Sequence, residues 1–394
     1  MQTSKDRILT THVGSLPRPA DLLTFLEARE RGEAFDQAAC DARVAQAVRD
    51  VVAQQVATGI DSVCDGEQSK ISYTFYVRHR LSGITAKTGT DIGAPPQTGA
   101  HRDIADHPDY AARLRAARGG TSWFASAAVP CCTGPVTYRD RGPLETDLKN
   151  LRAACDAAKP GEAFMNAASL GVLTKFVPDQ YYRNEDAYVE ALAEALKEEY
   201  EAIHKAGFIL QIDAPDLGSA RHNQYQHLSD DEFLRIADRN VAALNYATAN
   251  IPPEAMRIHI CWGNYEGPHT HDIALAKVFD TCMRARPQAL LFEAANPRHA
   301  HEWEDLRSAK IPDDKIMIPG CLDSTTNFVE HPRLVAQRIC NVANVVGRER
   351  VIAGTDCGFA TFAAQQNAVA PSIAWAKLAA LTEGARIATD RLWR

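Results

Sequence analysis

The chain has 394 residues, of which 45% are hydrophobic and 24% are charged, so it has enough apolar material for one large core. Its formal net charge is −7, and no basic stripe is present that could neutralise phosphates. This charge argues against binding to nucleic acid or to an acidic membrane surface. No stretch approaches the roughly 18 apolar residues that a membrane helix needs.

The first residues of the chain and its cysteine content bear on the cellular compartment in which the protein is expected. The first residues, MQTSKDRILTTHVGSLPRP, lack the long apolar run of a signal peptide. Ten cysteines without an export signal are typical of a reducing environment, where thiols serve as metal ligands or buried small side chains. We therefore expect a cytoplasmic protein.

In chain order, short β-rich runs recur, and most of them are followed by a helical pattern. The runs are 11–15, 60–67, 126–136, 163–170, 208–213, 257–262, 289–294, 316–322 and 351–357. The clearest helix is predicted over 185–206, where apolar residues recur at helical spacing and Gly207 supplies the stop. Strands that alternate with helices predict parallel βαβ units.

The predicted fold is a single (β/α)8 barrel that spans residues 1–394. Nine runs are one more than this fold needs, and the run 126–136, with Gly134 and Pro135, fits an accessory hairpin better than a barrel strand. A doubly wound open sheet is the alternative, but no glycine-rich phosphate loop follows the first strand. The stretch of about 86–121 is rich in Gly, Pro, His and Asp, and we interpret it as a lid-like insertion over the barrel mouth.

Metal-binding residue types gather where the predicted strands end, which is where a barrel of this kind places its site. His259 and Cys261 are two positions apart on one strand, so both side chains can point to one face and reach a single ion. Glu293 and Cys357 stand at the ends of two later strands. One nitrogen, two sulfurs and one oxygen suit tetrahedral zinc, so we expect these four residues to bind Zn²⁺.

The expected ligand set also indicates a reaction. Two cysteinates and a glutamate leave the zinc site at about −1, which makes it a poor activator of water. If a substrate thiol replaces Glu293, the bound sulfur is ionised at neutral pH and stays electron-rich. We therefore expect a zinc-bound thiolate that attacks an alkyl carbon.

Other reactive residues have simpler interpretations. His269 and His271 follow the metal-binding strand by several residues and are expected to cap a helix or face solvent. Cys131 and Cys132 are expected to pack in the interior. The chain lacks a G-x-S-x-G elbow, which argues against serine hydrolysis.

The strand ends together resemble the catalytic barrel of the cobalamin-independent methionine synthase family. The matching segments are Val13-Gly14-Ser15, Gly66-Glu67, Gln211-Ile212-Asp213, His259-Ile260-Cys261, Glu293, Asp323 and Asp356-Cys357-Gly358. Their order and spacing agree over nearly the whole chain. The resemblance implies a zinc-dependent S-methyltransferase of methionine biosynthesis that acts on homocysteine. It also implies that Ser15, Glu67 and Asp213 bind this acceptor.

The chain departs from the family in three places. It has no room for the second barrel of the full-length synthases. Thr325 stands where the family has a histidine proposed as proton donor, so Asp323 is either the proton donor or a positioning residue. The segment Asn166–Leu173 matches the family's folate-binding element by position but lacks its tryptophan. The methyl donor is therefore open between methyltetrahydrofolate, methylcobalamin and another carrier, and the oligomeric state is open as well.

Three other functions compete with this one. An epoxyalkane–coenzyme M-type transferase shares the fold, and Arg18, Arg78 and Arg80 could serve its sulfonate, but Glu67 and Asp213 favour an amino acid. A metal-free enzyme similar to uroporphyrinogen decarboxylase would leave the four metal-binding residues unexplained. A zinc-storage or regulatory protein would not need substrate-type acids in an open barrel mouth.

Overall fold

The computed structural model describes residues 1–394 except 88–101, 118–128 and 364–367. Two parallel sheets, one of two strands and one of six, make up the barrel. Their strands are β1 (Leu9–Thr10), β2 (Ser62–Val63), β5 (Glu162–Ala168), β6 (Ile209–Asp213), β7 (Met256–Ile260), β8 (Ala289–Phe292), β9 (Ile316–Pro319) and β10 (Ile352–Ala353).

The pairings close this set of strands into a ring. The six-stranded sheet has the order β2-β5-β6-β7-β8-β9, and β10 pairs with β1. Parallel bridges from Met317 to Val351 and from Gly320 to Gly354 join β9 to the β10 segment. On the other side, the Asp61 amide donates to the Thr10 carbonyl oxygen at 3.2 Å, which joins β1 to the β2 segment. The predicted (β/α)8 barrel is therefore confirmed.

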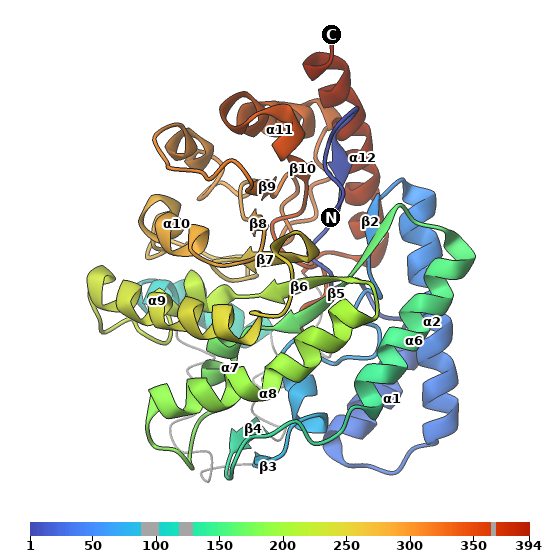
Figure 1. Ribbon diagram of the computed structural model, residues 1–394, viewed down its shortest axis with the longest axis vertical. Coiled ribbons are helices and arrows are strands. Elements are labelled where there is room, and N and C mark those ends of the chain that lie inside the picture. Colours follow the sequence, from blue (N-terminus) through green and yellow to red (C-terminus); the bar gives the residue numbers. More distant parts are fainter. Residues whose placement is uncertain (88–101, 118–128, 364–367) are drawn as a thin grey trace.

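Helices surround the barrel, as Figure 1 shows. They are α1 (Ala20–Arg31), α2 (Gln37–Thr58), α6 (Gly142–Ala158), α7 (Leu170–Phe176), α8 (Glu185–Lys205), α9 (Asp230–Ala247), α10 (Leu275–Met283), α11 (Pro332–Val346) and α12 (Pro371–Leu392), with a 3-10 helix over Glu302–Arg307 after β8. The helix predicted over 185–206 is α8, whose first turn is capped by the Asn184 side chain. Within the described ranges, no helix combines the length and apolar character that crossing a bilayer requires.

The ninth predicted strand lies outside the ring. It is β4 (Val129–Cys132), which pairs antiparallel with β3 (Ile84–Lys87), so this run forms an accessory two-stranded sheet, with the segment that carries α3 (Arg102–Asp106) and α4 (Pro108–Ala117), not a tight turn, between its strands. The expected lid over 86–121 falls partly outside the described residues. Its described part includes α3 and α4. Here Asp103 accepts hydrogen bonds from Tyr265 and Thr270, which belong to the loop after β7.

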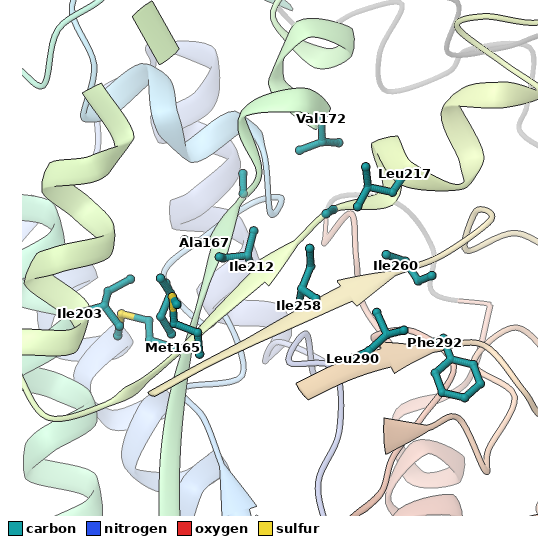
Figure 2. Packing of buried hydrophobic residues seen from close by; sticks show 14 of the residues in the cluster. Met165, Ala167, Val172, Ile203, Ile212, Leu217, Ile258, Ile260, Leu290 and Phe292 are labelled. Carbon is teal, nitrogen blue, oxygen red and sulfur yellow. The ribbon is translucent and has the colours of Figure 1, made fainter. Parts of the chain in front are cut away.

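Alternation along the strands separates two environments. On β8, Leu290 and Phe292 face the surrounding helices, whereas Leu291 belongs to a separate apolar cluster within the ring. Figure 2 shows Leu290 and Phe292 with their counterparts Ile258 and Ile260 on β7. Side chains on β6 and β7 alternate in the same way between the helices and the inside of the ring. Residues that are paired in register on neighbouring strands therefore point to the same side.

The inward face of β6 and β7 is polar. The Arg257 guanidinium donates to Gln211 Oε1 at 2.7 Å and to Thr11 Oγ1 at 2.9 Å, and it lies 3.5 Å from the centroid of the Phe164 ring. One inward step further along these strands are Asp213 and His259, which are register partners. The polar stripe therefore ends at the carboxyl edge of the barrel, where a site is expected.

Candidate functional site

Three of the four predicted metal ligands meet at the carboxyl edge of the barrel. His259 is the fourth residue of β7, Cys261 follows that strand, and Cys357 lies in the loop after β10. One potential ligand atom from each lies within 4.8 Å of the other two, and all three residues are buried. Cys357 Sγ is 3.7 Å from His259 Nε2.

Glu293 lies beside this cluster. Its Oε1 is 3.6 Å from Cys357 Sγ and accepts a hydrogen bond from the Trp262 amide at 2.8 Å. The Asn296 side chain donates to its Oε2 at 2.7 Å. These two donors hold the carboxylate at the edge of the cluster, outside the tight group of three ligand atoms.

The chemistry of these four residues fits a cation. The Cys357 thiol donates to Cys261, which lowers the pKa of Cys261 and raises that of Cys357. Burial and the nearby Cys261 raise the pKa of Glu293 well above its ordinary value. Three acidic groups so close together repel one another when they ionise, and a divalent ion between them would offset that repulsion.

Asp213 is buried next to the cluster. It ends β6, where Asn166 Nδ2 donates to Oδ2 at 2.9 Å and Gln211 Nε2 donates to Oδ1 at 2.8 Å. Burial raises the pKa of Asp213 to about 6. A buried carboxylate favours a cationic partner, such as an ammonium group.

Ser15 and Glu67 are joined by Arg18. The Arg18 guanidinium donates to Ser15 Oγ at 2.7 Å and forms an ion pair with Glu67 Oε2 at 3.3 Å. The preceding turn requires a glycine, because Gly14 has φ 140° and a Cβ there would lie 2.4 Å from the Asn166 side chain. Glu67 itself has φ 56°, an unusual conformation for a residue with a side chain.

One cavity of about 180 Å³ brings most of the predicted residues together. It is lined by Ser15, Glu67, Asp213, His259, Cys261 and Cys357. Three aromatic rings add an apolar wall: Phe176 lies 5.9 Å from Tyr73 and 6.0 Å from Phe362, measured between ring centroids. The cavity is smaller than a typical drug-sized site and is suited to a molecule of amino-acid size.

A family model described as the catalytic domain of cobalamin-independent synthase matches residues 102–380. The chain belongs to this family. The resemblance inferred from the strand ends is thus confirmed, and the chain is a methyltransferase of the cobalamin-independent synthase family.

Curated relatives cover nearly the same length as this family member. A methionine synthase from Saccharolobus solfataricus is 22% identical over 98% of this chain and 96% of its own. A 2-hydroxypropyl-CoM lyase from Xanthobacter autotrophicus is 24% identical over the same shares of the two chains.

Solved structures show the shared fold. A B12-independent methionine synthase from a Shewanella species, in complex with selenomethionine, has a TM-score of 0.73 and 20% identity, with 98% of this chain and 99% of that one covered. A putative vitamin-B12-independent methionine synthase from Listeria monocytogenes has a TM-score of 0.64 and 16% identity, with 97% and 98% covered.

Asp323 lies outside the cavity lining of this family member. Its Oδ1 accepts from the Thr325 amide and hydroxyl, and its Oδ2 accepts from the Thr326 hydroxyl. Its own amide donates to Glu330, which forms an ion pair with the buried Lys377. These contacts organise the loop after β9, and a role in proton transfer stays a prediction.

The arginines that were considered for a sulfonate are engaged elsewhere. Arg78 forms an ion pair with Glu30, and Arg80 forms ion pairs with Asp147 and Glu199. Neither arginine lines the cavity.

A buried histidine network was not foreseen from the sequence. Asp272 contacts His222 at 3.0 Å, His269 at 2.7 Å and His299 at 3.0 Å. His299 stacks on Trp262 with 4.2 Å between ring centroids. The expectation for His269 was wrong, because its side chain is buried on Asp272. Through Trp262, whose amide donates to Glu293, the network supports the loop next to the cluster of His259, Cys261 and Cys357.

His271 differs from His269. It contacts Asp106 of α3 at 2.5 Å and so joins the insertion to the loop after β7. Both histidines were noted in the sequence, but their spacing of two residues does not distinguish a buried histidine from an exposed one.

Proposed function

We propose that this family member holds a zinc ion with His259, Cys261, Glu293 and Cys357 and transfers a methyl group to the thiol of homocysteine, which gives methionine. The observation that carries the proposal is the group of three ligand atoms, all within 4.8 Å of one another, in the wall of a cavity that also contains two buried acids. The acids suit an amino-acid acceptor, and the sulfur-rich group suits the metal.

The residues present fit zinc better than other divalent ions. Thiolate and imidazole donors favour zinc over magnesium or calcium, which prefer oxygen. When bound by such a set, zinc lowers the pKa of a thiol ligand to below neutral while the negative ligand set keeps the sulfur nucleophilic. The chain's own contribution is to hold Glu293 in place through the Trp262 amide and the Asn296 side chain.

The acceptor would be held by Glu67 and Asp213. With a pKa of about 6, Asp213 is largely ionised at pH 7 and can bind an α-ammonium group. Burial raises the pKa of Glu67, and Arg18, whose guanidinium lies 3.3 Å away, opposes that rise. The two carboxylates would orient the amino acid so that its thiol reaches the metal-binding cluster.

The runner-up is the addition of a coenzyme M-type thiol to an epoxide. The Xanthobacter relative, which is a 2-hydroxypropyl-CoM lyase by name, supports it. None of the three arginines considered for the sulfonate lines the cavity, where Lys175 is the one Lys or Arg among the described residues and two carboxylates would repel a sulfonate. The pair of acids therefore favours homocysteine.

A product screen tests the choice directly. Homocysteine and coenzyme M are each incubated with methyltetrahydrofolate, methylcobalamin and propylene oxide, and the thioethers are identified by mass spectrometry. We expect methionine from one of the methyl donors. Formation of 2-hydroxypropyl-coenzyme M alone would replace the proposal with its runner-up.

The metal requires its own measurement. We expect about one zinc per chain by elemental analysis, with loss of metal in Cys261→Ser. Cys321→Ser is the matched control, because this thiol is also buried at a strand end but contacts the Pro319 carbonyl instead of the cluster. Equal zinc in both variants would remove the metal assignment.

A cytoplasmic location is part of the proposal. All ten cysteines are free thiols, which is consistent with a reducing compartment. Fractionation of cells that express the protein, followed by immunodetection, would test this location.

A further inference from the structure

Lys175 is a half-buried lysine in the wall of the cavity, and its contacts differ from those of the buried lysines of the chain. Near the end of α7, it is the one Lys or Arg among the described residues that line the cavity. In the described part of the chain, its ammonium has no ion pair or hydrogen bond. By contrast, the Lys70 ammonium donates to the Asn166 carbonyl at 3.0 Å, and Lys377 is 2.8 Å from Glu330.

Because Lys175 is half-buried, its ammonium lies in the cavity wall without being fully removed from water. A cation beside apolar rings is stabilised when it gains an anionic partner, and charged groups with little water around them are normally paired. The Lys175 Nζ lies 5.1 Å from the centroid of the Phe176 ring, and the ammonium also interacts electrostatically with Cys261 without forming an ion pair. Burial lowers the pKa of Lys175 to about 8, so the group is still mostly protonated at pH 7.

The rest of the cavity has the opposite charge. Glu67, Asp213 and the cysteines of the cluster are acidic, and they would repel any carboxylate of a substrate. Arg18 cannot serve such a carboxylate, because it already binds Glu67, Ser15 and three backbone carbonyls. An anionic group that enters this space therefore has one cation available to it among the described residues.

We propose that Lys175 is a specificity-determining residue that binds the anionic group of a substrate beside the aromatic wall of Tyr73, Phe176 and Phe362. The inference rests on the proposed function and extends it, because it requires one of the two substrates to be an anion. That anion is either the carboxylate of the thiol acceptor or an acidic group of the methyl donor. The apolar rings exclude water, which strengthens the ion pair.

Two variants isolate the charge. Lys175→Met keeps the length and apolar stem of the side chain and removes the cation, whereas Lys175→Arg keeps the cation. Lys197→Met is the matched control, since Lys197 also lies over an aromatic ring, 4.9 Å from the Tyr246 centroid, but does not line the cavity. Zinc content and thermal unfolding of each variant establish that it is folded and loaded.

Calorimetry on the zinc-loaded protein then distinguishes the two sources of the anion. The ligands are homocysteine and 3-aminopropane-1-thiol, which is the same molecule without its carboxylate. If the acceptor supplies the anion, Lys175→Met weakens homocysteine binding about tenfold to hundredfold and leaves aminopropanethiol binding unchanged. Lys175→Arg restores most of the homocysteine affinity.

If the donor supplies the anion, homocysteine binds Lys175→Met and wild type equally. The KM for the anionic donor then rises about tenfold or more while kcat changes little, and Lys175→Arg again restores it. Unchanged homocysteine affinity together with an unchanged donor KM would overturn the assignment of Lys175. A wild-type protein that binds neither zinc nor any thiol would instead overturn the proposed function.

Discussion

Replacing Arg18 by methionine removes the cation that joins the loops carrying Ser15 and Glu67. Arg18 and Glu67 are both buried, and their ion pair spans 3.3 Å. The same guanidinium donates to the carbonyls of Leu16 at 3.1 Å, Lys70 at 3.1 Å and Ala360 at 2.6 Å. One side chain thus connects the loops after β1, β2 and β10.

The expected loss of unfolding free energy in Arg18→Met follows from the burial of the Arg18–Glu67 ion pair. Breaking a buried ion pair by removing one partner costs about 3–5 kcal/mol, because the remaining charge stays in a medium of low polarity. We expect Arg18→Met to lower the free energy of unfolding by this amount. The matched control is Arg7→Met, which breaks an ion pair to Asp61 whose arginine is 55% exposed and should cost within about 1 kcal/mol.

The pH dependence of this loss tests whether the unpaired Glu67 carboxylate causes it. Burial already raises the pKa of Glu67, and Arg18 opposes that rise. Without Arg18 the pKa of Glu67 in the folded state rises further above its unfolded value, so ionisation of this carboxyl opposes folding. The penalty should then be smallest at acid pH and grow as the pH rises through the folded pKa.

Urea unfolding at pH 5 and pH 8, followed by circular dichroism, measures both effects. Arg18→Lys should recover part of the loss, because it keeps the charge but not the forked geometry. A loss below about 1 kcal/mol in Arg18→Met, or a loss that does not depend on pH, would refute this reasoning.

Three further predictions address the metal, the acceptor and acid stability. Cys357→Ser should lose zinc as Cys261→Ser does, measured by elemental analysis, and full retention would exclude this thiol as a ligand. Asp213→Asn should keep zinc but weaken homocysteine binding by about tenfold or more in calorimetry, because a neutral amide cannot pair with an ammonium group; unchanged affinity would move the acceptor elsewhere. Burial lowers the pKa of His12 to about 4, against 6.5 in its unperturbed form, so stability should fall as the pH drops from 6.5 towards 4, by up to about 3 kcal/mol. His12→Gln should reduce that loss in urea unfolding at pH 7 and pH 5, and an equal loss in both proteins would contradict the assignment.

Much of the fold could be predicted because it depends on local patterns. Apolar runs that alternate with helical periodicity indicated the barrel, and the glycine and proline in 126–136 separated that run from the ring. The strands proved shorter than their runs. For example, 351–357 contains only Ile352–Ala353 as strand. The remaining residues of such runs form the loops that carry the site, which a hydrophobic pattern does not distinguish from strand.

The grouping of His259, Cys261 and Cys357 could also be predicted from the sequence, because it depends on the local periodicity of the strands. Alternation along β7 places His259 and Cys261 on one side, and Cys357 lies in the loop after β10 at the same edge of the barrel. Strand order alone therefore brought these three together. Glu293 also follows from strand order, but its position beside the cluster is decided by the Trp262 amide.

Other features were decided by tertiary structure alone. Arg18 and Glu67 were noted separately, one as a sulfonate partner and one as an acceptor-binding residue, yet they bind each other. Lys175 lies in an ordinary helical sequence, and its place as the one Lys or Arg among the described residues of the cavity wall becomes visible only in the assembled structure. The physical reason is that strand and helix periods specify which way a side chain points, whereas pairing of charges and the cost of burying them depend on segments brought together from distant parts of the chain.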